Sequence, residues 1–335
     1  MSGNSRKMNT IQAINEAIAE SMAADPKVLV LGEDVGDVEM GGVCGVTKGL
    51  STRFGEDRVR STPISEQAIM GAAIGAAMSG YKPIAEIMLM NFTTVAMDMI
   101  VNHAAKLRFM SGGQTSVPLV LRMMTGTGLS SGGQHSDFLE AWFAHTPGLK
   151  VVIPSNPADA KGLMLSAIND PDPVIFVETL RAYWTPGEVA EDQGPIPLGK
   201  ARIMREGSDV TIISYSDIAT RSLAAAAELE KEGISAEVID LRTIQPWDKE
   251  AVLASVRKTG RAVVAHEAVK SFGVGAEVAA TIQEEVFESL KAPVRRVGAP
   301  FTSVPFSKVL EDAFTVSVAD IAAAVRATVG ERAIA

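Results

Sequence analysis

One glutamate lies where an acidic side chain could take up and release a proton. Glu66 follows Pro63, Ile64 and Ser65 and begins an expected helix over residues 66–79. Pro63 disfavours helix upstream of it, and Ser65 is a residue type that often caps a helix N-terminus. The helix dipole favours an ionised carboxylate, whereas burial beside an apolar helix favours the protonated acid. Glu66 is therefore a candidate acid–base group, although an ordinary first-turn glutamate fits the same spacing.

A second candidate is a glycine-rich stretch that ends in a histidine. Residues 125–136 contain four glycines and finish with Gln134-His135-Ser136, directly after an expected strand over 119–121. Loops after parallel strands bind ligands in many α/β proteins, and glycine allows a ligand to approach the backbone closely. Histidine is the side-chain type that exchanges a proton near neutral pH. The stretch lacks the lysine and the spacing of the common phosphate-binding loops, so the residues alone leave its ligand open.

The other three histidines are weaker candidates. His103 and His145 lie on expected helices, where packing or solvation explains them. His266 follows an expected strand and precedes Glu267, and its position fits a structural and a functional role equally.

Short apolar strands alternate with helices along the chain, a pattern typical of a parallel sheet covered by helices on both faces. An apolar stripe at helical spacing, from Ile11 to Met22, predicts an N-terminal helix that ends before Asp25. The strands expected next are 28–31, 84–88, 119–121, 150–154 and 174–177, with helices over 66–79, 93–110 and 157–169. A second series comprises strands 209–214, 236–241 and 261–265, with helices over 219–232 and 248–258.

Prolines, glycines and acidic residues separate the two series over residues 182–199, which predicts an extended linker. The sequence thus predicts a first α/β domain over residues 1–185, a linker over 186–203 and a second α/β domain over 204–330.

Composition excludes several classes of protein. The chain has 335 residues, 31 Lys+Arg against 40 Asp+Glu, and a net charge of −9, which argues against binding nucleic acid or an anionic membrane. The single cysteine, Cys44, excludes an internal disulfide framework and suits a reducing cytosol. Charged residues interrupt the apolar region 68–100, so we expect no membrane span and a cytoplasmic location. The hydrophobic content of 47% nevertheless suggests extra buried surface, as in a subunit.

Five motifs occur together and in one order: residues 32–35, 62–67, 134–136, 146–152 and 240–248. In this combination the chain resembles the β subunit of the thiamine-diphosphate-dependent decarboxylating component of 2-oxo acid dehydrogenase complexes. That family includes pyruvate, branched-chain 2-oxo acid and acetoin enzymes, and the resemblance covers residues 8–330.

The resemblance implies a transketolase-like α/β fold, in which a parallel-sheet pyrimidine-binding domain precedes a transketolase C-terminal domain. It implies that Glu66 bonds the pyrimidine ring of thiamine diphosphate and so promotes formation of the nucleophilic carbon. Ile64, Met88 and Phe92 match positions that line the pyrimidine pocket, although Met88 replaces a polar residue of some members. His135 matches an active-site histidine that assists acyl transfer to a lipoyl group.

The resemblance also implies a potassium ion held by backbone carbonyls. The matching positions are Leu119, Ala167, Ile168, Asp170 and Asp172, although an extra proline, Pro171, lies inside that turn.

A Gly-Asp-Gly motif, which in this family begins the magnesium–diphosphate site, is absent from the sequence. The resemblance therefore implies that an α subunit binds magnesium and the diphosphate, in an α2β2 heterotetramer with a second β subunit. Its further partner is the lipoylated dihydrolipoyl acyltransferase. Two alternatives stay open, namely a subunit of a split transketolase-type enzyme and a scaffold that docks the acyltransferase core. Pyruvate, acetoin and branched-chain 2-oxo acids remain possible substrates.

Overall fold

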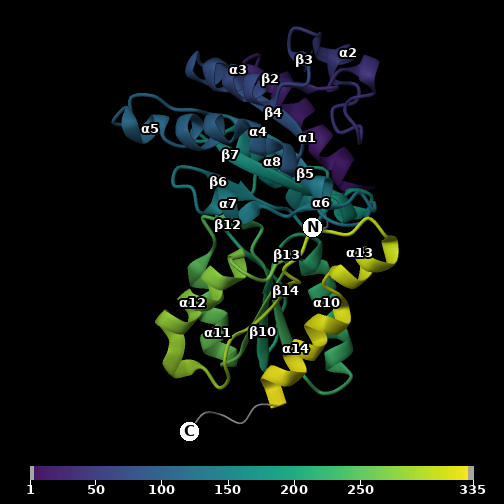
Figure 1. The fold of residues 1–335 in the computed structure, drawn as a ribbon, viewed down its shortest axis with the longest axis vertical. Coiled ribbons are helices and arrows are strands. Elements are labelled where there is room, and N and C mark those ends of the chain that lie inside the picture. The colour runs from purple at the N-terminus through teal and green to yellow at the C-terminus, as the bar shows by residue number, and fades with distance from the viewer. Residues whose placement is uncertain (1–3, 331–335) are drawn as a thin grey trace. The chain divides into compact units, whose positions relative to one another are not determined.

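A computed structural model describes residues 4–330, which form two compact units (Figure 1). The first comprises Met1–Thr125 and Trp142–Leu198, and the second comprises Gly126–Ala141 and Gly199–Ala335. Each unit is an α/β structure of its own, as the two series of strands and helices predicted. The segment 126–141, which contains His135, clusters with the second unit although it lies inside the first predicted domain.

The first unit contains a parallel sheet with the strand order β6-β7-β5-β4-β2-β3. These strands are β2 Val28–Glu33, β3 Val59–Thr62, β4 Lys82–Leu89, β5 Val120–Thr125, β6 Lys150–Val152 and β7 Val174–Thr179. The strands β5 and β7 are buried along their whole length, as expected for the centre of a parallel sheet.

Helices α1 Thr10–Ala24 and α8 Pro157–Ile168 pack together against this sheet and share one apolar core with it. Side-chain capping near the N-terminus sets the first residue of both helices. Asn9 and Gln12 form a capping box at the start of α1, and the Asn156 side chain accepts from the Asp159 amide before Pro157 opens α8. The predicted helix boundaries are confirmed here to within a residue or two.

Helix α3, Glu66–Met78, packs on β4 and buries Ile69, Met70 and Ile74, while Ala68 and Ala72 face outward. The expected helix over 93–110 is interrupted: α4 Thr93–Asp98 continues into a π-helical segment, Met99–Ala104, and then α5 Leu107–Met110. The remaining helices of this unit are α2 Leu50–Phe54 and α9 Leu180–Tyr183, and α7 Glu140–Ala144 spans the boundary between the units.

The expected linker contains a strand that the sequence analysis missed. Strand β8, Gly187–Ala190, pairs antiparallel with β1, Ser5–Met8. Val189 of β8 and Met8 of β1 are buried together beside Ala13, so the pairing covers apolar surface at one end of α1. The prolines and glycines nearby concealed this strand, because it has only four residues and begins with one of those glycines, Gly187.

The second unit contains a sheet with the order β14-β13-β10-β11-β9, parallel except for β9. Its strands are β9 Arg202–Arg205, β10 Val210–Ser214, β11 Ala236–Asp240, β13 Ala262–Val269 and β14 Arg295–Ala299, with a further short strand, β12 Thr243–Gln245. Its helices are α6 Gly133–Ser136, α10 Ser216–Glu230, α11 Lys249–Thr259, α12 Val274–Val286, α13 Lys308–Phe314 and α14 Val318–Gly330.

The stretch Lys308–Gly330 is long and apolar enough to cross a membrane by length and composition alone. It is divided into α13 and α14, and Ile321, Ala322 and Val325 of α14 belong to the buried core of the second unit. We therefore interpret it as core-packing helix.

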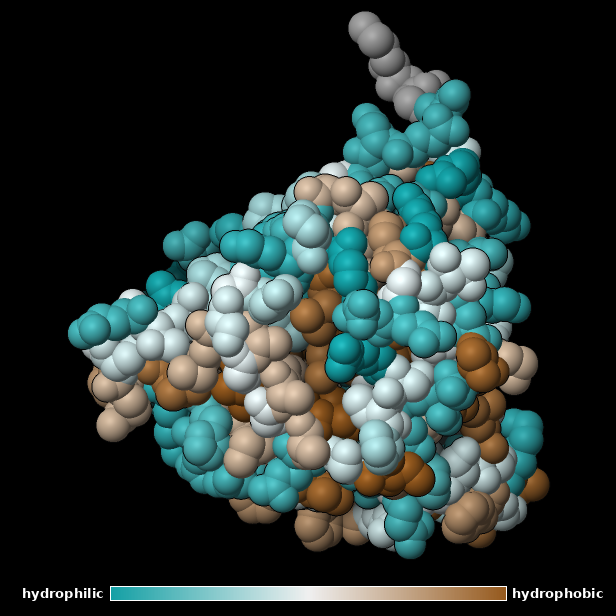
Figure 2. Space-filling view, turned by 90° about the horizontal axis from the view of Figure 1, so that it is seen from above, coloured by the Kyte–Doolittle hydropathy of each residue, from teal (hydrophilic) through white to brown (hydrophobic). Residues whose placement is uncertain are grey.

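Large apolar side chains also reach the surface, and Figure 2 shows several such brown areas among hydrophilic residues on one face. The most exposed include Val38, Ile64, Phe109, Phe272, Phe301 and Val309, each at least three-quarters exposed. Exposed apolar groups of this size are common where a protein contacts a partner.

Candidate functional site

The first unit gathers four predicted site residues at one edge of its sheet. Parallel strands end at the same edge, and β2 lies between β3 and β4. After β2 the chain forms β3 on one side of it, and then crosses to form β4 on the other side. The direction of the strand order therefore reverses between β2 and β4, and this position is a topological switch point. Ligands of open α/β sheets bind at such points. Ile64 and Glu66 follow β3, whereas Met88 and Phe92 lie at the end of β4 and just after it.

Glu66 is the first residue of α3 and is partly buried. Ser65 is the N-cap residue of α3, as predicted, but its hydroxyl donates to the Pro63 carbonyl at 3.1 Å and makes no capping bond to the helix. Because the Ser65 side chain does not bond them, the first backbone amides of α3 keep their partial positive charge, which favours negative charge near Glu66.

A second carboxylate, Glu33, lies at the end of β2 and was missed as a site candidate. Burial, and then the negative charges of Asp34 and Glu66, raise the pKa of Glu33. Its placement in the motif over residues 32–35, at the end of an apolar strand, was the signal that could have found it. Glu33 and Glu66 together make this edge of the sheet acidic.

The apolar members of the predicted pocket differ in exposure. Met88 and Phe92 are partly buried and pack on the core of the first unit. Ile64, in contrast, is 75% exposed. An isoleucine this exposed offers apolar surface that a ligand or another protein could cover.

A buried ionic network lies within the strands of the same unit. Arg122 on β5 is 2% exposed and donates two hydrogen bonds to the Glu178 carboxylate on β7. Its Nε lies 2.7 Å from Oε1, and an Nη lies 2.6 Å from Oε2. It also pairs with Glu86 on β4, and the Tyr183 hydroxyl donates to Glu178. Burial raises the pKa of Glu86 to about 7, while the Arg122 charge opposes that rise.

His135 belongs to the second unit, where it lies exposed in the four-residue helix α6. The segment before it leaves regular structure after β5, and several of its residues have positive φ, including Gly126 and Gly132. A Cβ at Gly132 would lie 2.5 Å from the Phe306 ring, so glycine is required there. His135 itself is exposed at the surface of this unit.

Two buried carboxyl groups flank this segment, and neither was predicted. Glu140 accepts from the Tyr215 hydroxyl at 2.7 Å, and burial raises the pKa of Glu140 to about 7. Glu267 accepts from the Thr127 backbone and hydroxyl, and burial also raises the pKa of Glu267. Both contacts join residues more than 70 apart in sequence, which explains why local patterns did not reveal them.

His266 has a structural role. Its ring is buried, Nδ1 lies 3.1 Å from the Ala268 carbonyl oxygen, and burial lowers its pKa to about 4. A Cβ on any of three neighbouring glycines would come within 2.9 Å of the ring: Gly273, Gly275 and Gly298. His103 and His145 are exposed, so of the two expected explanations, packing and solvation, the structure supports solvation.

The buried ring of His266 makes stability depend on pH. Between about pH 4 and 6.5 the unfolded imidazole binds a proton that the folded one does not, so the free energy of unfolding falls as pH falls. We expect His266 to account for a loss of about 2 kcal/mol between pH 7 and 5, and His266→Asn to remove that part of the slope. Urea unfolding at both pH values measures it, with the exposed His103→Asn as control. An unchanged slope in His266→Asn would contradict this assignment.

The residues predicted to hold potassium lie in the first unit. The Leu119 carbonyl precedes β5 and accepts from the Val174 amide at 2.9 Å, and the Ala167 carbonyl accepts from the Asp170 amide at 3.3 Å. The Asp170 side chain bonds the Lys150 ammonium, and the Asp172 side chain bonds Arg108. With both carboxylates paired to cations, a metal ion here would depend on the remaining lone pairs of backbone carbonyls.

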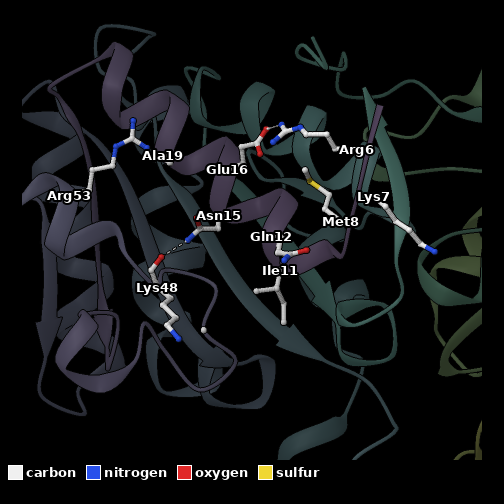
Figure 3. Close-up of a pocket in the computed structure, with 11 residues that line it drawn as sticks. Arg6, Lys7, Met8, Ile11, Gln12, Asn15, Glu16, Ala19, Lys48 and Arg53 are labelled. Carbon is white, nitrogen blue, oxygen red and sulfur yellow. Dashed lines mark hydrogen bonds and ion pairs between the residues drawn. The ribbon is translucent and has the colours of Figure 1, made fainter. Parts of the chain in front are cut away.

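A separate hollow of about 580 Å³ lies between β1, α1 and the segment around Lys48 (Figure 3). Its lining includes the basic residues Arg6, Lys7, Lys48 and Arg53. Arg6 forms an ion pair with Glu16, and the Asn15 side-chain amide donates to the Lys48 carbonyl. None of the predicted site residues lines it.

Comparison with known proteins matches both units. Residues 6–184 match the transketolase pyrimidine-binding domain, and residues 199–321 match the transketolase C-terminal domain. The chain is 49% identical to the "Acetoin:2,6-dichlorophenolindophenol oxidoreductase subunit beta" of Cupriavidus necator, over 96% of this chain and 98% of the relative. It is 48% identical to the "Pyruvate dehydrogenase E1 component subunit beta" of Bacillus subtilis, over 90% and 93% respectively.

A solved structure, "Split gene transketolase, inactive beta4 tetramer", resembles the chain with a TM-score of 0.80 at 24% identity, over 96% of this chain and 98% of that one. This likeness supports the predicted transketolase-like α/β fold.

Proposed function

This chain belongs to the family of acetoin and pyruvate dehydrogenase β subunits, and from that premise we propose that it supplies the pyrimidine half of a thiamine-diphosphate site. The proposed reaction is oxidative decarboxylation of a 2-oxo acid, or cleavage of acetoin, with acyl transfer to a lipoyl group. The observation that carries this proposal is Glu66, which opens α3 at the switch point of a pyrimidine-binding domain.

The chemistry of the residues at this edge fits the cofactor. In this proposal the Glu66 carboxyl group, at the start of α3, bonds a ring nitrogen of the cofactor and shares a proton with it. Ile64 offers an exposed apolar surface to the ring, with Phe92 and Met88 as further walls. When bound, thiamine diphosphate would supply a nucleophilic carbon and an electron-accepting ring that no side chain provides.

An α subunit supplies the other half in this proposal. The sequence lacks the Gly-Asp-Gly motif, so magnesium and the diphosphate would be bound by that second chain. The exposed apolar side chains of both units support burial against partners in an α2β2 heterotetramer. A potassium ion on the Leu119 and Ala167 carbonyls and a cytoplasmic location complete the proposal.

Acetoin and pyruvate are the substrates that the relatives' names favour, because both occur at 44% identity or more. No specific observation favours the alternative of a split transketolase, whose likeness extends to the fold alone. A scaffold function toward the acyltransferase is compatible with catalysis.

His135 tests the acyl-transfer step. We expect His135→Asn, reconstituted with the α subunit, to slow acyl transfer to a lipoyl domain by about 100-fold, because in this proposal the exposed imidazole donates a proton in that step. Turnover with an artificial electron acceptor, which bypasses the lipoyl group, should fall much less. Assays with pyruvate and with acetoin measure both rates.

The exposed His145→Asn serves as the matched control and should leave both rates unchanged. An equal loss of both rates in His135→Asn would remove the specific role in acyl transfer, and unchanged rates would place His135 outside the site.

A further inference from the structure

The segment that leads to His135 has an irregular backbone. Within seven residues, φ is positive at Gly126, Gly128, Ser130 and Gly132, with Ser130 at 53°. A serine in the left-handed region costs roughly 1 kcal/mol or more unless its surroundings fix it there. The segment therefore needs external contacts to hold a single conformation.

Glu311 on α13, yellow in Figure 1, provides the first contact. Its side chain is fully buried, and Oε1 accepts from the backbone amides of Gly128 at 2.9 Å and Ser130 at 3.1 Å. Two amides that converge on one carboxyl oxygen form a small anion-binding nest. Because this oxygen takes both amides, Glu311 fixes the turn that contains the strained serine.

Glu267 on β13 provides a second contact. Its Oε1 accepts from the Thr127 amide at 2.7 Å and from the Thr127 hydroxyl at 2.9 Å. A Cβ at Gly126 would lie 3.0 Å from the same oxygen, so the backbone approaches the carboxyl group closely. The Thr315 hydroxyl, one turn after Glu311, donates to the Thr127 hydroxyl at 2.9 Å.

We propose that Glu311 and Glu267 are positioning residues for His135, which they hold in its active conformation through hydrogen bonds to Thr127, Gly128 and Ser130. The inference rests on the proposed role of His135 in acyl transfer. Neither carboxyl group needs to touch substrate. Their effect follows from geometry, since a displacement of ~1 Å in an acid–base group can cost ~100-fold in rate.

Two substitutions of Glu311 test the proposal in the full chain. Glu311→Ala removes the acceptor, so the Gly128 and Ser130 amides should exchange with deuterium at least tenfold faster. Glu311→Gln retains a carbonyl acceptor and should restore most of the protection. Exchange is measured on the purified chain and does not depend on activity.

The same variants are then reconstituted with the α subunit. We expect Glu311→Ala to lower kcat for lipoyl acylation by about tenfold or more, with little change in the KM for the 2-oxo acid. Turnover with an artificial acceptor should fall less, and Glu311→Gln should recover part of the lost kcat.

Glu237 gives a matched control. It is equally buried in the second unit and bonds Ser255 and Lys258 on α11. Glu237→Ala should lower stability without altering exchange at Gly128 and Ser130 or the split between the two rates.

Unchanged exchange in Glu311→Ala would overturn the proposal, as would faster exchange with unchanged acylation. A similar loss of acylation rate in Glu237→Ala would mean that the loss in Glu311→Ala comes from general destabilisation, and this too would overturn the proposal. If His135→Asn leaves acylation intact, the proposed function of His135 fails, whereas the exchange result still reports on the Glu311 contacts.

Discussion

Arg122→Met lowers the free energy of unfolding by about 3–5 kcal/mol, because it leaves two buried carboxyl groups without their cation. Arg122 is 2% exposed and pairs with Glu86 and Glu178 on the neighbouring strands. Methionine retains much of the side-chain volume, so the loss reports charge and hydrogen bonds more than a cavity. Urea unfolding of the wild type and Arg122→Met at pH 8 measures the change.

Two controls sharpen this expectation. Arg60 is 65% exposed and pairs with an almost fully exposed Asp57, so Arg60→Met should cost less than about 1 kcal/mol. Adding Glu86→Gln and Glu178→Gln to Arg122→Met should recover part of the stability, since no uncompensated charge then remains. A loss below about 1 kcal/mol for Arg122→Met would contradict the buried network.

The fold was predictable where side-chain periodicity is strong. The apolar stripe of α1 and the apolar runs of β2 and β7 correspond to buried elements. Prediction failed where tertiary contacts override local pattern. Strand β8 forms because Val189 covers Met8, a residue about 180 positions earlier, and no local rule foresees that pairing.

The site was predictable in part for a similar reason. Glu66 and its neighbours follow strands, so their place at one sheet edge follows from topology. Arg122 and Glu178 directly follow the expected strands 119–121 and 174–177, which in the structure extend to Thr125 and Thr179. Opposite charges directly after two apolar runs were the unused signal. Glu311 lies 183 residues from Gly128, and its contact with that amide has no signature in sequence.

Glu66→Gln is expected to lower turnover by about 100- to 10,000-fold, the range for losing a positioned acid–base group. Glutamine has the same shape and retains an acceptor oxygen, but it cannot hold and return a proton. Since Glu66 is partly buried at the start of α3 and makes no ion pair in the described structure, we expect folding and assembly with the α subunit to persist. The exposed Glu56→Gln, in the same unit, is the matched control and should retain full activity.

The most direct test of the half-site is therefore turnover of pyruvate and acetoin with thiamine diphosphate and magnesium. The assay compares the purified chain alone, the chain with its α subunit, and Glu66→Gln with the α subunit. We predict activity only for the wild-type pair, with Glu66→Gln assembled but at least about 100-fold slower. Turnover by the chain alone, or by the Glu66→Gln pair at the wild-type rate, would contradict the account.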